Sequence, residues 1–430
     1  MKQYRLQILT LFLAVSLFSC KEEDVVSDNT AGAQTFTRTD SLKLFVAQVM
    51  EEWYLWNDII PELNVDDYDT PDDVLYAMMN KDLDKWSYIQ EEEAYNAYFE
   101  NAQYEGYGFR MAFDEDDNLR VAFVYNDSPF GRAGVKRSWI IDKIDGVRPK
   151  ELNDKGLLSQ ALEGNTHKFE MLLPDGSRKI ESLSKSTIGI NTVLTDNVYS
   201  IGSHTIGYLA FNSFLATSEE ELIQTFQKFK TANIDELIID LRYNGGGRTN
   251  IAEWMASNII GDLGKGKNFI EYQFNQLQSE QNRVEAFNEA EIPLNLDRVI
   301  FITSRSSASA SELLINGLRP FIDVVLIGDN TYGKPVGSFP FFFSGYAISP
   351  ISFKVLNDQG VGEYYQGLVA DAYVADDLNY ELGDTNEARL QEALYYIKNG
   401  IFSSASARQQ PLSKIQQIEL EGFRREIGAF

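Results

Sequence analysis

The amino-acid sequence predicts a multidomain α/β protein, and three patterns along the chain lead to that expectation. Apolar residues recur at helical spacing in residues 41–103, fall into short alternating runs in residues 104–185, and form strands that alternate with helices in residues 195–400. A chain of 430 residues with 44% apolar content can bury a core in each segment. We therefore expect a small N-terminal helical domain, a β-rich domain and an α/β core.

The helical pattern of the first segment comes in two stretches, joined by a polar linker that is rich in aspartate and contains proline. The apolar positions are Leu44, Val46, Val49, Met50, Trp53 and Leu55 in the first stretch, and Val74, Leu75, Met78 and Met79 in the second. This spacing is typical of helices that bury one face.

The β-rich segment contains four short runs that read as strands, separated by turn signals. The runs are 109–113, 120–124, 139–141 and 169–173. Between the first two lies an acidic stretch, 114–118, whose alternating carboxylates resemble a calcium loop. Leu119 and Tyr125 occupy the positions where such a loop needs glycine and a bidentate glutamate, so a hairpin turn is the better interpretation.

Strands in the last segment lead repeatedly into helical stretches or glycine-containing turns. Strand-like runs cover 206–211, 236–241, 299–303 and 324–327, and helical stretches cover 218–231 and 309–318. Such alternation predicts a partly parallel sheet, and sheets of this kind carry their functional sites at the carboxyl ends of the strands. The unusual residues of the chain lie at those ends.

The composition excludes several classes of function. A formal net charge of −26 would repel a phosphate backbone, so nucleic-acid binding is not expected. One cysteine cannot form an intrachain disulfide, and two distant histidines cannot supply a zinc site of the usual four-ligand kind. We expect neither a metal nor a cofactor.

The amino terminus has the pattern of an export signal. Lys2 and Arg5 precede an apolar run that is too short to span a membrane comfortably, which indicates a signal peptide over residues 1–19. The following Cys20 ends a stretch that resembles a bacterial lipobox, so we expect it to be lipidated; ordinary secretion with an incidental cysteine is the alternative. The stretch 21–24, a lysine followed by three acidic residues, resembles the basic-then-acidic signal that sends some Bacteroidetes lipoproteins to the outer face of the outer membrane.

These features predict an exported protein that is anchored by lipid to the outer membrane, at either its periplasmic face or the cell surface. Residues 20–40 are polar and predict a flexible tether. Residues 401–430 form a C-terminal extension with a weak helical pattern and no assigned role.

The richest candidate for chemistry is the serine-rich segment 304–312, which lies between a strand and a helix. A serine at such a junction presents its hydroxyl where free N–H groups favour a developing oxyanion, although serines also crowd helix starts as caps. His167 and His204 have no neighbouring acid pattern that would make either a base. A desolvated lysine can take that role, and Lys334 follows the next strand at the same edge.

A third candidate element is the glycine-rich turn after the strand that ends near Asp240. The turn, Asn244 to Gly247, permits positive φ angles and an inward-pointing amide, as an oxyanion hole requires. It lacks the Gly-Lys-Ser/Thr ending of a phosphate loop, so nucleotide binding is not expected.

From about residue 42 to 400, these motifs in this order resemble the C-terminal processing peptidases, or tail-specific proteases, which use a Ser-Lys dyad. The resemblance implies a ClpP/crotonase-like α/β core, Ser309 between two alanines as nucleophile, and Lys334 in Thr-x-Gly-Lys as base. It also implies an oxyanion hole made by the amides of Ala310 and Gly246. The segment 206–214 resembles the family's entering strand, and 367–371 its closing strand.

The same resemblance implies that the β-rich domain is a PDZ domain that binds the tails of polypeptide substrates. Gly106, Tyr107, Gly108 and Phe109 resemble its carboxylate-binding loop, and residues 128–134 resemble the segment that opens its helix. A β domain that only packs on the catalytic core is the alternative.

Two residues depart from the family pattern. Ser338 stands where many members have a glutamine that orients the lysine, so it is a candidate for support of the dyad. The stretch 137–139 replaces a commoner Gly-Asp pair after the PDZ helix. The sequence thus predicts a serine endopeptidase, with a catalytically silent, peptide-binding scaffold lipoprotein as the alternative.

Overall fold

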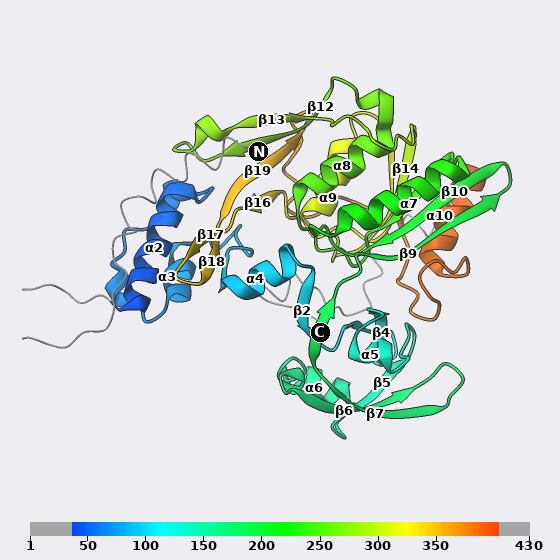
Figure 1. Cartoon of the computed structure of the whole chain (residues 1–430), viewed down its shortest axis with the longest axis horizontal. Coiled ribbons are helices and arrows are strands. Elements are labelled where there is room, and N and C mark those ends of the chain that lie inside the picture. The colour runs from blue at the N-terminus through cyan, green and yellow to red at the C-terminus, as the bar shows by residue number, and fades with distance from the viewer. Residues whose placement is uncertain (1–36, 404–430) are drawn as a thin grey trace, which may run out of the picture. The chain divides into compact units, whose positions relative to one another are not determined.

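The computed structural model describes residues 37–403 (Figure 1). The expected signal peptide, Cys20, most of the tether and all but the first three residues of the C-terminal extension lie outside the described residues. Within the described part, no helix is both long enough and apolar enough to cross a bilayer.

The N-terminal helical region, residues 38–99, is mainly helical and also contributes one strand. Its elements are α2 (Arg38–Trp53), η2 (Asn57–Ile59), η3 (Val65–Asp67), α3 (Pro71–Met78), β1 (Tyr88–Glu91) and α4 (Glu92–Phe99). Helix α2 begins three residues before the expected boundary at 41. Thr70 caps α3 through a reciprocal pair of hydrogen bonds with Asp73, and Pro71 fits the first helical position.

The β-rich domain, residues 103–189, contains a five-stranded antiparallel sheet in the order β3-β4-β5-β6-β7. Its strands are β3 (Phe109–Phe113), β4 (Leu119–Val124), β5 (Ile140–Ile144), β6 (Thr166–Leu172) and β7 (Arg178–Ser184). The flanking strands β2 (Gln103–Gly106) and β8 (Ser186–Gly189) pair separately, and the helical elements are α5 (Pro129–Arg132), α6 (Pro149–Asp154) and η4 (Gln160–Leu162). Strand β3 lies at the sheet's edge, and the acidic stretch after it is the predicted hairpin turn.

The α/β core, residues 193–399, is built on a six-stranded sheet in the order β20-β15-β14-β11-β10-β9. These strands are β9 (Val193–Ile201), β10 (His204–Phe211), β11 (Glu236–Asp240), β14 (Arg298–Thr303), β15 (Asp323–Gly328) and β20 (Ala372–Tyr373). Neighbouring strands run parallel from β20 to β10, and only β9 is antiparallel to its neighbour, as the strand-helix alternation predicts.

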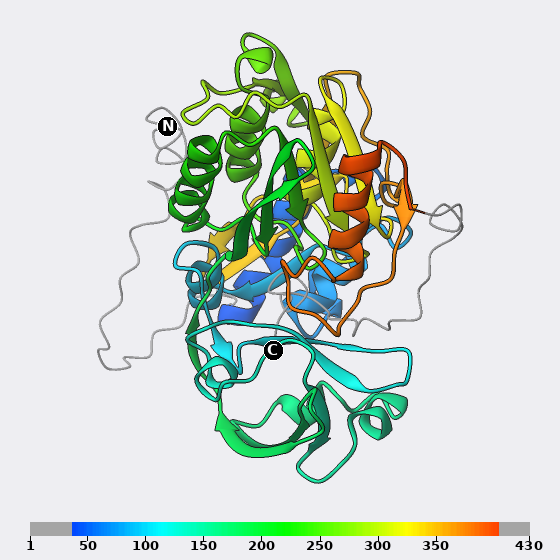
Figure 2. The same ribbon diagram turned by 90° about the vertical axis from the view of Figure 1, so that its right-hand side faces the viewer.

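Helices cover both faces of this sheet (Figure 2). One face packs against α7 (Ser218–Ala232), α8 (Thr249–Ile260) and α9 (Ala310–Leu318), and the other against α10 (Ala388–Asn399). Alternate residues of each strand face opposite helices: Ile239 packs with the first group and Ile238 with α10. A fully buried sheet of this kind fixes where its strand ends lie.

Two smaller sheets extend the core. The first has the order β13-β12-β19-β16, with β12 (Asn268–Phe274), β13 (Arg283–Ala286), β16 (Val336–Ser338) and β19 (Ile351–Asn357). The second has the order β1-β18-β17, with β17 (Phe341–Phe343) and β18 (Tyr346–Ser349). Short 3-10 turns cover η5 (Gly261–Gly264) and η6 (Ser279–Gln281).

The expected closing strand at 367–371 is wrong by position, because the strand that closes the sheet is β20, at Ala372–Tyr373. The preceding segment instead binds the lysine-bearing segment. Leu368 donates its amide to Thr331 Oγ1 at 2.7 Å, and its carbonyl accepts the amide of Thr331 at 3.0 Å. Gly367, at a φ of +90°, approaches Thr331 so closely that a Cβ would lie 2.1 Å from its carbonyl oxygen.

Candidate active site

Ser309 lies at the junction between β14 and α9, as its segment predicts. Its backbone has φ +56° and ψ −116°, a conformation that is rare and costly for any residue except glycine. The side chain is half-buried, and α9 begins at the next residue, Ala310. The strained turn thus places a hydroxyl at a helix amino terminus, where backbone amides lack helical partners.

Three other serines of this segment, Ser304, Ser307 and Ser311, bind the neighbouring strand end. Their hydroxyls donate to main-chain carbonyls after β11: Ser304 to Arg242, Ser307 to Leu241 at 2.7 Å, and Ser311 to Asn244 at 3.1 Å. The amide of Ala308 also donates to Asn244, at 3.1 Å. The serine-rich composition therefore ties the Ser309 segment to the glycine-rich turn.

Gly246 lies directly against Ser309. A Cβ at this glycine, whose φ is +108°, would meet Ser309 Cβ at 2.7 Å and the Ala308 carbonyl oxygen at 2.8 Å. Its amide donates to the side-chain oxygen of Asn244 at 2.9 Å. The expectation that this amide binds an oxyanion therefore does not fit the arrangement, because its single hydrogen is already used by Asn244.

Lys334 follows β15 through a turn that contains Gly333, and its side chain is buried, with 7% of the residue exposed. Gly333 has a φ of +99°, and a Cβ there would lie 2.4 Å from the Tyr365 carbonyl oxygen. Only glycine fits this close approach to Tyr365. The turn thus places Lys334 near the amino terminus of α9.

Glu312 joins the two candidate residues. Its buried carboxylate accepts four hydrogen bonds: to Oε2 from the amides of Ser309 at 3.0 Å and Lys334 at 2.8 Å, and to Oε1 from the Gly333 amide at 2.7 Å and Thr331 Oγ1 at 2.5 Å. Burial raises the pKa of Glu312 to about 7, and these hydrogen bonds oppose that rise. One carboxylate thus fixes the backbones of both candidate residues.

Sequence reasoning missed Glu312, although a signal was present. Ser309 and Glu312 form the Ser-x-x-Glu pattern of a capping box, which predicts the bond from the Ser309 amide to the carboxylate. The bonds to the lysine segment depend on tertiary contacts and have no such signal.

Ser338, the candidate for dyad support, lies at the end of β16. Its backbone is the register partner of Ile351 on β19. Its hydroxyl makes no hydrogen bond to any residue of the described range, so a supporting role for Ser338 stays a prediction without a contact behind it.

Both histidines have carboxylate partners, which the sequence did not indicate. His167 Nδ1 lies 2.5 Å from Asp145 Oδ2 in the β-rich domain, and His204 Nδ1 lies 3.4 Å from Asp235 Oδ2. His204 begins β10, whereas Ser309 follows the carboxyl end of β14, which runs in the same direction. His204 therefore lies at the amino ends of the parallel strands, whereas Ser309 lies at their carboxyl ends.

The four residues of the expected carboxylate-binding loop connect β2 to β3. Tyr107 and Phe109 are fully buried in the core of the β-rich domain, so only their backbones face a ligand. Gly108 has a φ of +80°, its carbonyl accepts the Tyr125 amide, and its amide bonds to the buried hydroxyl of Tyr104.

Arg110, on the edge strand β3, reaches from the β-rich domain to the Ser309 segment. Its guanidinium donates to Ser306 Oγ at 2.6 Å and lies over the ring of Tyr243, 5.4 Å from the centroid. Tyr243 directly precedes the glycine-rich turn. The strand that begins at the expected tail-binding loop thus contacts both segments that surround the nucleophile candidate.

Arg137, one of the residues that depart from the family pattern, is buried in an ionic network. Asp376 Oδ1 accepts from the guanidiniums of Arg137 and Arg242, each at 2.8 Å, and Arg242 also binds Asp240 and Glu387. Burial alone would raise the pKa of Asp376, but the two guanidiniums hold it well below its ordinary value. The network links the β-rich domain to the strand end before the glycine-rich turn.

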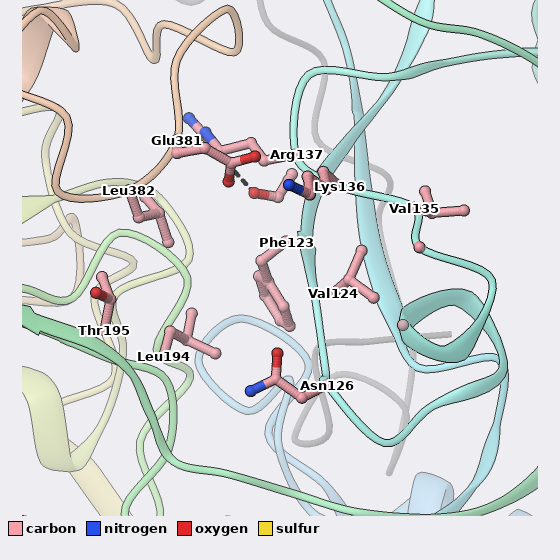
Figure 3. A pocket seen from close by; sticks show the side chains of 13 residues that line it. Phe123, Val124, Asn126, Val135, Lys136, Arg137, Leu194, Thr195, Glu381 and Leu382 are labelled. Carbon is pink, nitrogen blue, oxygen red and sulfur yellow. Dashed lines mark hydrogen bonds between the residues drawn. The ribbon is translucent and has the colours of Figure 1, made fainter.

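A cavity of about 440 Å³ lies beside this network, between the β-rich domain and the core (Figure 3). Phe123, Val124 and Asn126 line one side, and Leu194 and Leu382 line the other. The two domains thus meet around a hollow, with Arg137 at its wall. Among residues 37–403, no group of His, Cys, Asp and Glu side chains could hold a metal ion.

Two family models match the chain. Residues 205–372, which contain the glycine-rich turn, Ser309 and Lys334, match peptidase family S41, and residues 41–88 match the peptidase S41 N-terminal domain. Together the two matches cover half of the chain. The chain belongs to peptidase family S41. Membership of this family makes it a serine-type peptidase.

Relatives of this S41 peptidase agree with the family assignment. The carboxy-terminal processing protease CtpA of Bacillus subtilis (strain 168) is 23% identical over 405 residues, which cover 89% of this chain and 82% of that protein. CtpB of the same strain is 23% identical over 237 residues, which cover 54% of this chain and 47% of that protein. The latter match therefore spans about half of the relative.

A solved structure shows the same fold. The crystal structure of an S41 protease from Bacteroides fragilis NCTC 9343 matches with a TM-score of 0.68 at 22% identity, covering 88% of this chain and 99% of that chain. The match extends beyond the protease segment, because it includes most of the described residues.

Proposed function

We propose that this S41 peptidase hydrolyses peptide bonds of exported polypeptides, with Ser309 as nucleophile and Lys334 as base. The observation that carries the proposal is the shared carboxylate oxygen, Glu312 Oε2, which binds the amides of both residues. A buried clamp of this kind holds two segments in a fixed relation, and positioning of the nucleophile against its base is a large part of catalysis.

The proposed reaction proceeds through an acyl-enzyme. Lys334 Nζ takes the Ser309 hydroxyl proton while Oγ attacks the scissile carbonyl carbon, and the resulting ammonium returns the proton to the leaving amine nitrogen as the C–N bond breaks. A water molecule then gives a proton to Lys334 Nζ as its oxygen attacks the ester carbon. The resulting ammonium returns that proton to Ser309 Oγ as the ester C–O bond breaks, which regenerates the dyad and leaves a carboxylic acid that ionises in solution. Burial of Lys334 keeps its amine away from bulk water.

Two backbone amides are candidates for the oxyanion hole. The Ala310 amide belongs to the first turn of α9, where it has no helical acceptor. Gly247 is a better second donor than Gly246, because its amide makes no hydrogen bond to another described residue. Both amides belong to segments that pack against Ser309, so each could donate to an oxygen that develops charge there.

We further propose that the β-rich domain acts as a PDZ domain and binds substrate tails along the free edge of β3. The edge position of β3, which directly follows the loop Gly106 to Phe109, supports strand addition by a peptide. The alternative, simple packing on the core, draws support from the apolar cluster in which Ala112 and Ala122 meet Leu215. Isothermal titration with peptides that carry either a free or an amidated C-terminus distinguishes the two.

The proposed location is the outer membrane, with Cys20 as the lipidated residue. The test is membrane fractionation of cells that produce the wild-type chain or Cys20→Ser. We expect the variant to leave the membrane fraction, and its continued association would overturn the proposal. Protease shaving of intact cells then distinguishes the cell surface from the periplasmic face.

The peptidase proposal is tested by turnover of an unfolded protein with the full-length chain in detergent. We expect Ser309→Ala and Lys334→Ala each to lose activity by roughly 10³-fold or more. Ser257→Ala on α8 and Lys354→Ala on β19 are matched controls, because they remove a hydroxyl and an amine elsewhere in the core. Peptide binding without any turnover in wild type would favour the silent scaffold.

A further inference from the structure

The N-terminal helical region is hydrogen-bonded to the main chain at one end of β19. The amide of Leu55 donates to the Ile351 carbonyl at 2.8 Å, and the amide of Ile351 donates to Ser87 Oγ at 2.9 Å. Beside this point β1 pairs antiparallel with β18, with Tyr88 opposite Ser349. Residues far apart in sequence thus fix Ile351 from both of its backbone groups.

Strand β19 is also the strand on which the segment after Lys334 rests. Val355 donates its amide to the Pro335 carbonyl at 3.1 Å, and β16 pairs antiparallel with β19 as far as Ser338, the register partner of Ile351. The residue that the N-terminal region fixes therefore lies across from the end of the lysine-bearing segment. A shift of Ile351 would move that segment.

Trp86 makes a second connection, on the other side of Lys334. Its side chain is buried, and its ring packs edge-on against Tyr332, with 6.3 Å between centroids. Tyr332 lies two residues before Lys334, and its amide donates to the Ser307 carbonyl at 2.9 Å. Trp86 itself is held by the buried carboxylate of Asp84, which accepts the Trp86 amide at 2.9 Å.

The contacts through Ile351 and through Trp86 reach the chain on the two sides of Lys334. The apolar core of the N-terminal region includes Val336 and Ile351 as full members, with Tyr332 packed against it. The hydroxyl of Ser338 makes no hydrogen bond to a described residue, whereas the residues on both sides of Lys334 pack against this apolar core. Aromatic contacts of this kind restrain a segment by packing, without a charged partner.

We propose that the N-terminal helical region is a positioning part of the active site, in which Trp86 fixes Tyr332 and thereby the neighbouring Lys334. This inference rests on the proposed function, because it takes Lys334 as the base. Trp86 is a positioning residue and touches neither substrate nor nucleophile. The region is then required for turnover as well as for folding.

The test compares three variants of the full-length chain. Trp86→Leu removes the ring, and Trp86→Phe keeps an aromatic face; because the indole N–H donates to no described residue, the phenylalanine variant loses no hydrogen bond. Trp56→Leu is the matched control, since the Trp56 ring packs against Tyr54 inside the same region. Each variant is measured for turnover of an unfolded protein across pH, for thermal unfolding, and for hydrogen exchange of residues 331–338.

We expect Trp86→Leu to lower turnover at least tenfold, to change the pH profile of turnover and to speed exchange in residues 331–338. Trp86→Phe should recover most of the turnover, and Trp56→Leu should stay within about twofold of wild type. Tyr332→Leu, which removes the other ring, should reproduce the effect if Trp86→Leu fails to fold.

Two results separate this inference from the proposed function. Unchanged exchange in residues 331–338 and unchanged turnover in Trp86→Leu, with Lys334→Ala inactive, would overturn the positioning role and leave the dyad intact. Absence of turnover in wild type would overturn the dyad, and exchange in residues 331–338 would still decide whether Trp86 fixes this segment.

Discussion

The backbone amides of Ser309 and Lys334 donate to the same oxygen, Oε2 of Glu312, at 3.0 and 2.8 Å. The two residues are separated by a helix and a strand in the chain, so this contact defines the relation between the α9 start and the turn after β15. The carboxylate of Glu312 thus acts as a clamp between the two segments.

Replacing Glu312 with glutamine should reduce turnover about 100-fold, a magnitude typical of a small misplacement of reacting groups. The amide has one accepting oxygen, so its NH₂ group must face two of the four donors that the carboxylate binds. Steady-state turnover of an unfolded protein checks this. Wild-type activity in Glu312→Gln would show that the shared carboxylate is not needed to position Ser309 and Lys334.

Glu312 should also make stability depend on pH. Burial raises its pKa to about 7 from an ordinary 4.5, so the folded state binds the proton more tightly than the unfolded state. Its contribution to the unfolding free energy is full below about pH 4.5 and is lost as pH rises through about 7, by roughly 3 kcal/mol in total. Urea unfolding of wild type and Glu312→Gln gives the difference, and a difference that does not fall over this range contradicts the assignment.

Gly246→Ala should abolish turnover, because the new Cβ would lie 2.7 Å from Ser309 Cβ. Gly360→Ala is the matched control: Gly360 also has a positive φ, +73°, but nothing lies within 4 Å of its Cβ position. Both variants place a side chain at a positive φ, and only the first collides with the nucleophile. Equal activity losses in the two would show that strain, not contact with Ser309, is responsible.

Arg137→Met should lower the unfolding free energy by about 3–5 kcal/mol, since it removes one partner from a buried ionic network. Arg178 forms a pair with Asp142 at the same distance of 2.8 Å, but 61% of its side chain is exposed. Arg178→Met should therefore cost less than about 1 kcal/mol. Chemical denaturation measures both, and similar costs would mean that the Arg137 network is not buried as described.

The contact between Arg110 and Ser306 should couple the β-rich domain to the Ser309 segment. A double-mutant cycle with Arg110→Met and Ser306→Ala should give a coupling energy of about 1–3 kcal/mol in the activation free energy of turnover. Additive effects, with a coupling near zero, would separate β3 from the active site.

Strand and helix positions were largely predictable, because they follow from local patterns. The run 109–113 is strand β3, and the helical stretch at 309–318 is α9, because apolar alternation and turn residues are properties of neighbouring positions. The location of Ser309 at a strand-to-helix junction follows from the same pattern.

The relations between distant residues could not be read in this way. The sequence shows that Arg137 departs from the family pattern. It does not show that Arg137 binds Asp376, which lies 239 residues away. The glycine-rich turn predicted an inward-pointing amide without saying which one, and the bond from Gly246 to Asn244 depends on a side-chain conformation. The contact of Trp86 with Tyr332 likewise joins regions with no shared sequence pattern.

Covalent labelling by a fluorophosphonate, located by peptide mass spectrometry, tests the dyad most directly because it needs no knowledge of the substrate. The dyad predicts a single adduct at Ser309 in wild type, loss of that adduct in Lys334→Ala, and labelling slowed by about 100-fold in Glu312→Gln, with cooperative thermal unfolding retained in both variants. An adduct at another serine, or labelling of Ser309 that is equally fast in Lys334→Ala, would contradict the assignment of Lys334 as the base.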